Sequence, residues 1–357
     1  MNNSLSHLGP HFIVGLKSTT LLDQEKRDLE RLKPSGIIIF KHNLAFDDPE
    51  GWIEKLHALF KSAKEASEGS CYLFSVDHEG GRVHRFPPPV TKFKAACHWK
   101  DNTQAVACAM ANELKALGCN LSYAPVLDVF SEPANTVIGD RALGKTPEEV
   151  SKYAPIYIHS LHEEGVVACG KHFPGHGATI ADSHFELPKL DVPLEVIEER
   201  ELPPFISAIN AGVQMMMTAH VVYPALDKEF PSTISKTIIT GLLREKLGYS
   251  KVVITDDSEM KALGGLSLEE RAVKSIGAGV DMLLVGNPKD AVALDRAIEM
   301  AEGIKKAIES KSLTIKQIEA SQERISNLKS FTFSIAKESP QLSVIGCEKH
   351  SSLAMIG

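Results

Sequence analysis

The sequence lacks the features that mark exported, membrane-spanning or nucleic-acid-binding proteins. No apolar run approaches the roughly 18 residues that a membrane-spanning helix requires, and residues 12–16 form too short a stretch for the apolar core of a signal peptide. Lys and Arg number 39 against 46 Asp and Glu, a formal charge of −7, and no run of five like charges offers a surface to nucleic acid or anionic lipid. We therefore expect a cytoplasmic protein without nucleic-acid or membrane partners.

Cysteine pairs and nucleotide-binding loops are also missing. The six cysteines are scattered without a Cys-x-x-Cys pair, which is typical of reduced thiols that fill apolar space and argues against a disulfide or zinc framework. No Gly-x-Gly-x-x-Gly follows an apolar run, and no Walker-type loop is present. We expect no bound metal and no cofactor.

The composition is that of a folded protein. Hydrophobic residues make up 43% and charged residues 24% of the 357 positions, which separates the chain from disordered sequences and provides a sizeable core. The length allows one large domain or two ordinary ones.

Short apolar runs rich in β-formers alternate with stretches of helical periodicity, a pattern that predicts β-α units on a parallel sheet. The predicted strands cover residues 12–16, 36–40, 73–77, 120–128, 166–172, 214–220, 252–256 and 282–287. Eight units in about 330 residues favour an α/β fold, a single (β/α)8 TIM barrel with its active site at the carboxyl ends of the strands. A doubly wound open sheet is the second choice. We place the barrel in residues 1–332 and a tail in residues 333–357.

The expected helix ends carry their own signals. Thr146, Ser267 and Thr314 each precede a Glu or Gln by three residues, as in a capping box. Gly118, Gly212, Gly248 and Gly279 fall shortly before predicted strands, where a helix is expected to end on a left-handed residue.

Polar residues cluster where the predicted strands end. Asp77 follows the third strand at a Gly-Gly turn, where its carboxylate is either a turn cap or a ligand for hydroxyl groups. Arg141 follows Asp140 in a long connection, and taken alone it reads as a surface charge paired with that neighbour. The seventh strand runs into Asp256 and Asp257, whose side chains should point to opposite faces, so that one of them enters the barrel mouth.

The densest cluster follows the fifth strand. Two glycines, a proline, three histidines, a lysine and an aspartate fall within residues 171–184, which is typical of a polar loop that closes over a site. Asp182 stands two residues before His184, a spacing at which a carboxylate can orient an imidazole and raise its basicity. A strand-end aspartate and such a histidine are the groups that nucleophilic catalysis with acid-base assistance requires.

The chain resembles the β-N-acetylglucosaminidases of glycoside hydrolase family 3, the NagZ type. The resemblance runs from about residue 12 to residue 328 and rests on three motifs in order: Val76-Asp77-x-Glu79-Gly80-Gly81-Arg82, Lys171-His172-Phe173-Pro174-Gly175-His176-Gly177 with Asp182-Ser183-His184, and Thr255-Asp256-Asp257. It implies a retaining hydrolysis of terminal β-linked N-acetylglucosamine, with the saccharide or muropeptide substrate taken from peptidoglycan recycling. We expect a monomer.

The resemblance also implies a role for each matched residue. Asp256 would be the nucleophile, and His184 the general acid and then the general base, with Asp182 as its partner. An imidazole in that role departs from the two carboxylates of most retaining glycosidases. The implied sugar-binding residues are Asp77, Arg85, Arg141, Lys171 and His172.

His78 replaces the usual Gln and Ser258-Glu259-Met260 the usual Leu-Ser-Met, departures that bear on substrate range. Residues 344–354 resemble the start of the linker to a second domain in larger relatives, which reads as a remnant or a surface extension.

Three alternatives remain open at this point. A metal-dependent hydrolase would use His172, His176 and His184 as ligands, although their spacing matches no standard zinc motif. A Schiff-base aldolase would use Lys171. A sugar-sensing barrel would bind the same ligand without catalysis.

Overall fold

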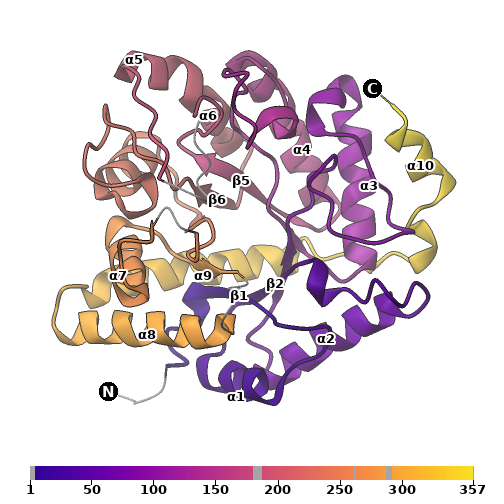
Figure 1. Ribbon diagram of the computed structural model, residues 1–357, viewed down its shortest axis with the longest axis horizontal. Helices are drawn as coiled ribbons and strands as arrows, with labels where there is room; N and C mark the ends of the chain where they lie inside the picture. The colour runs from indigo at the N-terminus through magenta and orange to yellow at the C-terminus, as the bar shows by residue number, and fades with distance from the viewer. Residues whose placement is uncertain (1–4, 180–186, 261–262, 287–291, 357) are drawn as a thin grey trace.

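Eight parallel strands form the centre of the molecule (Figure 1). The structure is a computed structural model that describes residues 5–179, 187–260, 263–286 and 292–356. The strands are β1 Phe12–Gly15, β2 Gly36–Ile39, β3 Leu73–Val76, β4 Leu121–Ser122, β5 Val167–Phe173, β6 Met215–Thr218, β7 Val252–Ile254 and β8 Leu283–Val285. Each of the eight predicted strands is present.

The strand order shows that the sheet closes on itself. Neighbouring strands follow the order of the chain from β1 to β7, and β8 pairs with β1. A parallel bridge between Ile254 and Met282 joins the remaining edges beside β7 and β8. The fold is therefore a (β/α)8 barrel and not an open doubly wound sheet.

The strand residues alternate between two apolar clusters, as a pleat with a period of two requires. Ile13, Leu73 and Met215 point into the barrel with the interior cluster. Val14, Ile37 and Val253 belong to the cluster between the strands and the surrounding helices. Because both faces are covered, β1, β2 and β7 are buried along their whole length.

Helices surround the barrel and close its amino-terminal end. The outer α-helices are α1 Asp23–Leu32, α2 Trp52–Ala66, α3 Thr103–Ala116, α4 Pro147–Glu163, α5 Leu194–Val196, α6 Leu202–Asn210, α7 Leu268–Ala278 and α8 Ala293–Glu309, with π-helical stretches at Ile197–Glu201 and Thr237–Lys246. In α9, Ile315–Ser334, the side chains of Ile325 and Leu328 join the interior cluster beside Tyr72, which precedes β3. No helix in the described part of the chain is long and apolar enough to cross a bilayer.

The predicted caps are confirmed. The side chains of Thr146, Ser267 and Thr314 each accept a hydrogen bond from the backbone N–H three residues later, at the starts of α4, α7 and α9. The four glycines predicted at helix ends have φ between 72° and 110°.

The fourth strand is shorter than predicted. Its ladder covers Leu121–Ser122, and a single further bridge joins Val126 to Lys171. Pro125 has no N–H to donate, which interrupts the ladder within the apolar run. Asp128 consequently lies beyond the strand and not at its end.

The residues after α9 return to the body of the molecule. The predicted boundary at 332 lies within α9, and a short 3-10 turn, Leu342–Val344, and α10, Glu348–Ala354, pack on α3 (Figure 1). All six cysteines are free thiols, and Cys71, Cys119 and Cys169 are buried.

Candidate active site

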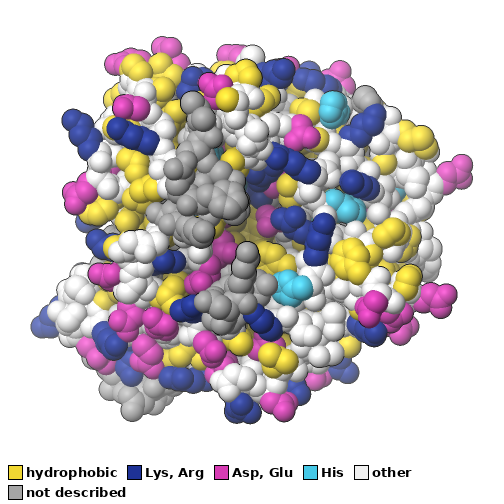
Figure 2. Space-filling view, in the orientation of Figure 1, with side chains coloured by type: hydrophobic (Ala, Val, Ile, Leu, Met, Phe, Trp, Pro, Cys, Tyr) yellow, Lys and Arg dark blue, Asp and Glu magenta, His cyan; other side chains and the backbone are white. Residues whose placement is uncertain are grey.

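A polar pocket of about 540 Å³ opens where the strands end. Its walls come mainly from the residues after β3, the end of β5 and the residues after β7. Lys and Arg side chains gather next to Asp and Glu side chains near the centre of this face (Figure 2). The carboxyl ends of barrel strands are where the active sites of this fold lie.

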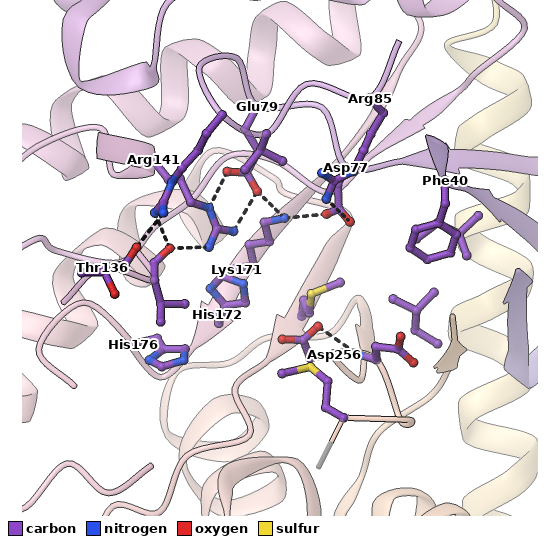
Figure 3. A pocket seen from close by; sticks show the side chains of 18 residues that line it. Phe40, Asp77, Glu79, Arg85, Thr136, Arg141, Lys171, His172, His176 and Asp256 are labelled. Carbon is purple, nitrogen blue, oxygen red and sulfur yellow. Dashed lines mark hydrogen bonds and ion pairs between the residues drawn. The ribbon is translucent and has the colours of Figure 1, made fainter. Parts of the chain in front are cut away.

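Lys171, near the carboxyl end of β5, is the centre of an ion-pair network. Its Nζ lies 2.8 Å from Asp77 Oδ1 and 2.6 Å from Glu79 Oε1, and its side chain is 2% exposed. Arg141 Nε and Nη2 donate to the two oxygens of Glu79 at 2.8 and 2.9 Å (Figure 3). Arg141 thus pairs with Glu79 in the lining of the pocket, and the interpretation of it as a surface charge beside Asp140 is wrong.

Lys171 and Glu79 stay charged despite their burial. Burial would lower the pKa of Lys171, but Asp77 and Glu79 outweigh it and raise that pKa. Burial would raise the pKa of Glu79, but Arg141 and Lys171 hold it well below its usual range. A Schiff-base lysine needs a lowered pKa to present a neutral amine. The network therefore disfavours the aldolase alternative.

Asp77 also faces a second cation. Arg85 Nη2 lies 3.7 Å from Asp77 Oδ2, and both side chains are about a quarter exposed to the pocket. Asp77 therefore lies between Lys171 and Arg85 with its carboxylate open to a ligand. The position fits a group that accepts hydrogen bonds from sugar hydroxyls.

His172 is held by a buried carboxylate. Its Nδ1 lies 2.7 Å from Asp128 Oδ2, while Asp128 Oδ1 accepts the backbone N–H of His176 at 2.7 Å. Burial would raise the pKa of Asp128, but His172 outweighs it and the pKa is lowered. Asp128 therefore fixes the imidazole at the pocket wall and anchors the residues that follow β5.

Asp256 and Asp257 both line the pocket. Both residues follow β7, which ends at Ile254, so the alternation of a strand does not fix the directions of their side chains. Their environments nevertheless differ. Asp257 Oδ1 accepts the backbone N–H groups of Gly286 at 2.9 Å and Glu259 at 3.1 Å, so it fastens the end of β7 to β8.

The two carboxyl groups also differ in acidity. Burial would raise the pKa of Asp256, but His172, His220 and the N–H of Asp257, which donates to Asp256 Oδ1 at 2.8 Å, outweigh it and lower the pKa. Burial raises the pKa of Asp257 to about 6. Lys171 and His172 lie between Asp256 and the pair of Glu79 and Arg141 (Figure 3). Asp256 is thus an ionised carboxylate that faces the pocket.

The predicted acid-base pair, Asp182 and His184, lies outside the described residues. The metal alternative included His184 with His172 and His176. Nδ1 of His172 is engaged by Asp128 and Nδ1 of His176 by Thr179 Oγ1 at 2.6 Å. Within the described ranges, no three His, Cys, Asp or Glu side chains are grouped as metal ligands would be.

Comparison with known proteins identifies the family. The model of the family described as "Glycosyl hydrolase family 3 N terminal domain" matches residues 13–328. The chain belongs to glycosyl hydrolase family 3. This membership makes it a glycoside hydrolase, and it favours catalysis over the sugar-sensing alternative.

Relatives of the family 3 chain are similar over most of its length. A protein named beta-hexosaminidase from Idiomarina loihiensis is 36% identical over 287 residues, which are 78% of this chain and 84% of that one. The structure of a β-N-acetylglucosaminidase from Paenibacillus sp. has a TM-score of 0.87 at 31% identity and covers 99% of this chain and 68% of its own. The structure of NagZ from Neisseria gonorrhoeae with N-trifluoroacetyl-D-glucosamine has a TM-score of 0.71 at 30% identity, and the match covers 89% of this chain and 97% of the NagZ chain.

The structure brings together every described residue that was predicted for the site. Asp77, Arg85, Arg141, Lys171, His172 and Asp256 all line the pocket. Two members were missed as candidates. Glu79 stands two residues after Asp77, and Asp128 ends the fourth apolar run, so both carried the signal of an acid at a strand end. The sequence does not show that Glu79 holds Lys171 and that Asp128 holds His172, both of which belong to β5.

Proposed function

We propose that this family 3 enzyme is a retaining exo-β-N-acetylglucosaminidase that removes terminal non-reducing β-linked N-acetylglucosamine. The observation that carries the proposal is the carboxylate of Asp256 opposite the Asp77-Lys171-Glu79-Arg141 ion-pair network in one pocket. The printed names of the relatives from Idiomarina, Paenibacillus and Neisseria support the same sugar.

The pocket suits one sugar with part of its aglycone. Its volume of about 540 Å³ is within the range of roughly 300–1,000 Å³ for small-molecule sites. On one wall, Asp77 can accept hydrogen bonds from sugar hydroxyl groups, and Lys171 and Arg85 can donate hydrogen bonds to them. Phe40, Met217 and Met260 line another part and offer apolar contact to the C–H face of a sugar ring.

In the proposed first step, a carboxylate oxygen of Asp256 attacks the anomeric carbon and the bond to the leaving-group oxygen breaks. His184 donates a proton to that oxygen, with Asp182 holding the imidazole. In the second step, His184 takes a proton from water, the water oxygen attacks the anomeric carbon, and Asp256 departs. Two inversions give net retention.

The lowered pKa of Asp256 keeps the nucleophile ionised at neutral pH. The raised pKa of Lys171 keeps its charge beside the sugar. The second titrating group would be an imidazole, which gains and loses a proton near neutral pH without a buried apolar environment. This division of labour follows the general rule that the two groups of a glycosidase have separated pKa values.

We further propose that the natural substrate is N-acetylglucosaminyl-1,6-anhydro-N-acetylmuramic acid, with or without its peptide, in the peptidoglycan recycling of a bacterial cytoplasm. The resemblance to NagZ-type enzymes supports this narrower statement. Cleavage of this disaccharide with a higher kcat/KM than that of chitobiose is the expected result.

The test follows the anomer that is released first. The purified enzyme hydrolyses the anhydro-disaccharide in an NMR tube, and the account predicts β-N-acetylglucosamine as the initial product. Asp256→Asn should lose activity by several orders of magnitude, whereas the surface variant Asp140→Asn should retain it. Initial release of the α-anomer would overturn the retaining mechanism, and absence of hydrolysis of any β-N-acetylglucosaminide would overturn the function.

A further inference from the structure

The residues that follow β3 form an arm, residues 77–94, that runs out along the pocket and returns. The outgoing half supplies pocket residues: Asp77, Glu79, Arg82, Val83 and Arg85. The returning half is fixed to the outgoing half by the backbone hydrogen bond from Gly81 N to Phe93 O, 2.8 Å. Whatever holds the returning half therefore also sets the position of the sugar-binding half.

Glu113 of α3 holds the returning half of the arm. Its carboxylate accepts the backbone N–H of Thr91 at 2.8 Å and the hydroxyl of Thr91 at 2.6 Å. The Glu113 side chain is 1% exposed. Buried carboxylates are stable only when their oxygens are well supplied with donors.

The remaining donors to Glu113 come from the far end of the chain. Gly346 N–H donates to Glu113 Oε1 at 3.0 Å, and His350 Nδ1 lies 2.8 Å from the same oxygen. We call residues 337–356 the C-terminal segment. One buried carboxylate thus joins the arm, α3 and the C-terminal segment.

The C-terminal segment contacts the arm directly as well. A Cβ atom added at Gly346 would lie 2.2 Å from the carbonyl oxygen of Pro89, so the two backbones meet at a point where only glycine fits. Lys94 Nζ donates to the carbonyl of Met355 at 3.2 Å. Ile345 and His350 are buried in this contact, and α10 lies beside α3 in Figure 1.

We propose that the C-terminal segment positions the arm for sugar binding, acting through Glu113. His350 and Glu113 are then positioning residues, and the segment is a working part of the active site and not a surface extension. The inference rests on the proposed function for its kinetic readout. The nucleophile Asp256 is on the other side of the barrel mouth after β7, so loosening the arm should weaken substrate binding more than it slows the chemical steps.

The test compares variants that differ in one hydrogen bond. His350→Ala removes the donor to Glu113, while His350→Asn retains an N–H group near the position of Nδ1. Thr91→Val removes the hydroxyl donor to Glu113 from the arm itself. It replaces His350→Ala in the test if that variant does not fold. Ser352→Ala is the matched control in α10, because among the described residues the Ser352 hydroxyl bonds only to Glu348 O of its own helix, 2.9 Å.

KM and kcat are measured with an aryl N-acetyl-β-glucosaminide well below the unfolding midpoint of each variant. We expect His350→Ala and Thr91→Val to raise KM at least fivefold with kcat within twofold, and His350→Asn and Ser352→Ala to remain within twofold of the wild type. A lowered unfolding midpoint with KM unchanged in His350→Ala and Thr91→Val would overturn the inference and leave the segment only a stabilising element.

Hydrogen exchange of peptides covering residues 82–94 gives a readout without substrate. We expect at least tenfold faster exchange in His350→Ala than in Ser352→Ala. If the wild-type enzyme cleaves no glycosaminide but exchange is still faster in His350→Ala than in Ser352→Ala, the proposed function is wrong and the coupling between the C-terminal segment and the arm stands. Equal exchange in the two variants, with wild-type activity present, would defeat the coupling alone.

Discussion

Removing the charge of Glu79 should be the most disruptive single change at the pocket. The side chain is 3% exposed and accepts three charged contacts, two from Arg141 at 2.8 and 2.9 Å and one from Lys171 at 2.6 Å. Glu79→Gln leaves two buried cations opposite a neutral amide whose NH2 group faces their donors. Breaking a buried ion pair from one side costs roughly 3–5 kcal/mol. We expect a loss of unfolding free energy in that range.

Urea denaturation followed by tryptophan fluorescence measures this loss, because Trp52 and Trp99 are both buried. Asp140→Asn makes the same chemical change in an exposed pair, in which Arg82 Nε lies 3.3 Å from Asp140 and both side chains are about half exposed. Such pairs contribute about 0.2–1 kcal/mol. A loss in Glu79→Gln no greater than that in Asp140→Asn would refute the view that the buried network maintains the site. The kcat/KM of Glu79→Gln should also fall, since Lys171 and Arg141 lose the anchor that they share.

Three further predictions concern pH, the acid-base group and metal. Burial raises the pKa of Glu201 from 4.5 to about 7. The contribution of Glu201 to stability is therefore complete below pH 4.5 and is lost as the pH rises through 7, by about 3 kcal/mol. The difference in unfolding free energy between wild type and Glu201→Gln, measured from pH 4.5 to 8.5, should follow this curve, and a difference that does not change with pH would contradict it. His184→Ala should slow hydrolysis of a disaccharide far more than that of a dinitrophenyl glycoside, which needs little protonation; equal losses would argue against His184 as the acid. Prolonged dialysis against EDTA should leave kcat unchanged, because the proposed steps use only protein side chains, and activity that returns only on adding Zn²⁺ would favour the metal alternative.

Local features of the sequence predict most of the barrel. The apolar runs, the capping hydroxyls of Thr146, Ser267 and Thr314, and the left-handed glycines each depend on neighbours within a few residues. The predicted length of the fourth strand is wrong because composition alone does not take account of the missing N–H of Pro125. The positions of Asp77, Lys171 and Asp256 at strand ends place them at one mouth, since all strands of a barrel are parallel.

The pairing of side chains that are far apart in the sequence is beyond such reasoning. Glu79 is recognisable as part of a motif, but its contact with Arg141 spans 62 positions. The contact between Glu113 and His350 spans 237 positions. A Glu in the middle of a helix reads as a solvated charge, and only the packing of α10 on α3 shows it buried with four donors.

Trapping the glycosyl-enzyme tests the central claim most directly. The enzyme is incubated with an activated 5-fluoro-N-acetylglucosaminide, digested and analysed by peptide mass spectrometry. The account predicts one added sugar on the peptide that contains Asp256, no label in Asp256→Asn, and unchanged labelling in Asp140→Asn. A label on Asp257, Glu79 or any other residue would contradict the assignment of Asp256 as the nucleophile.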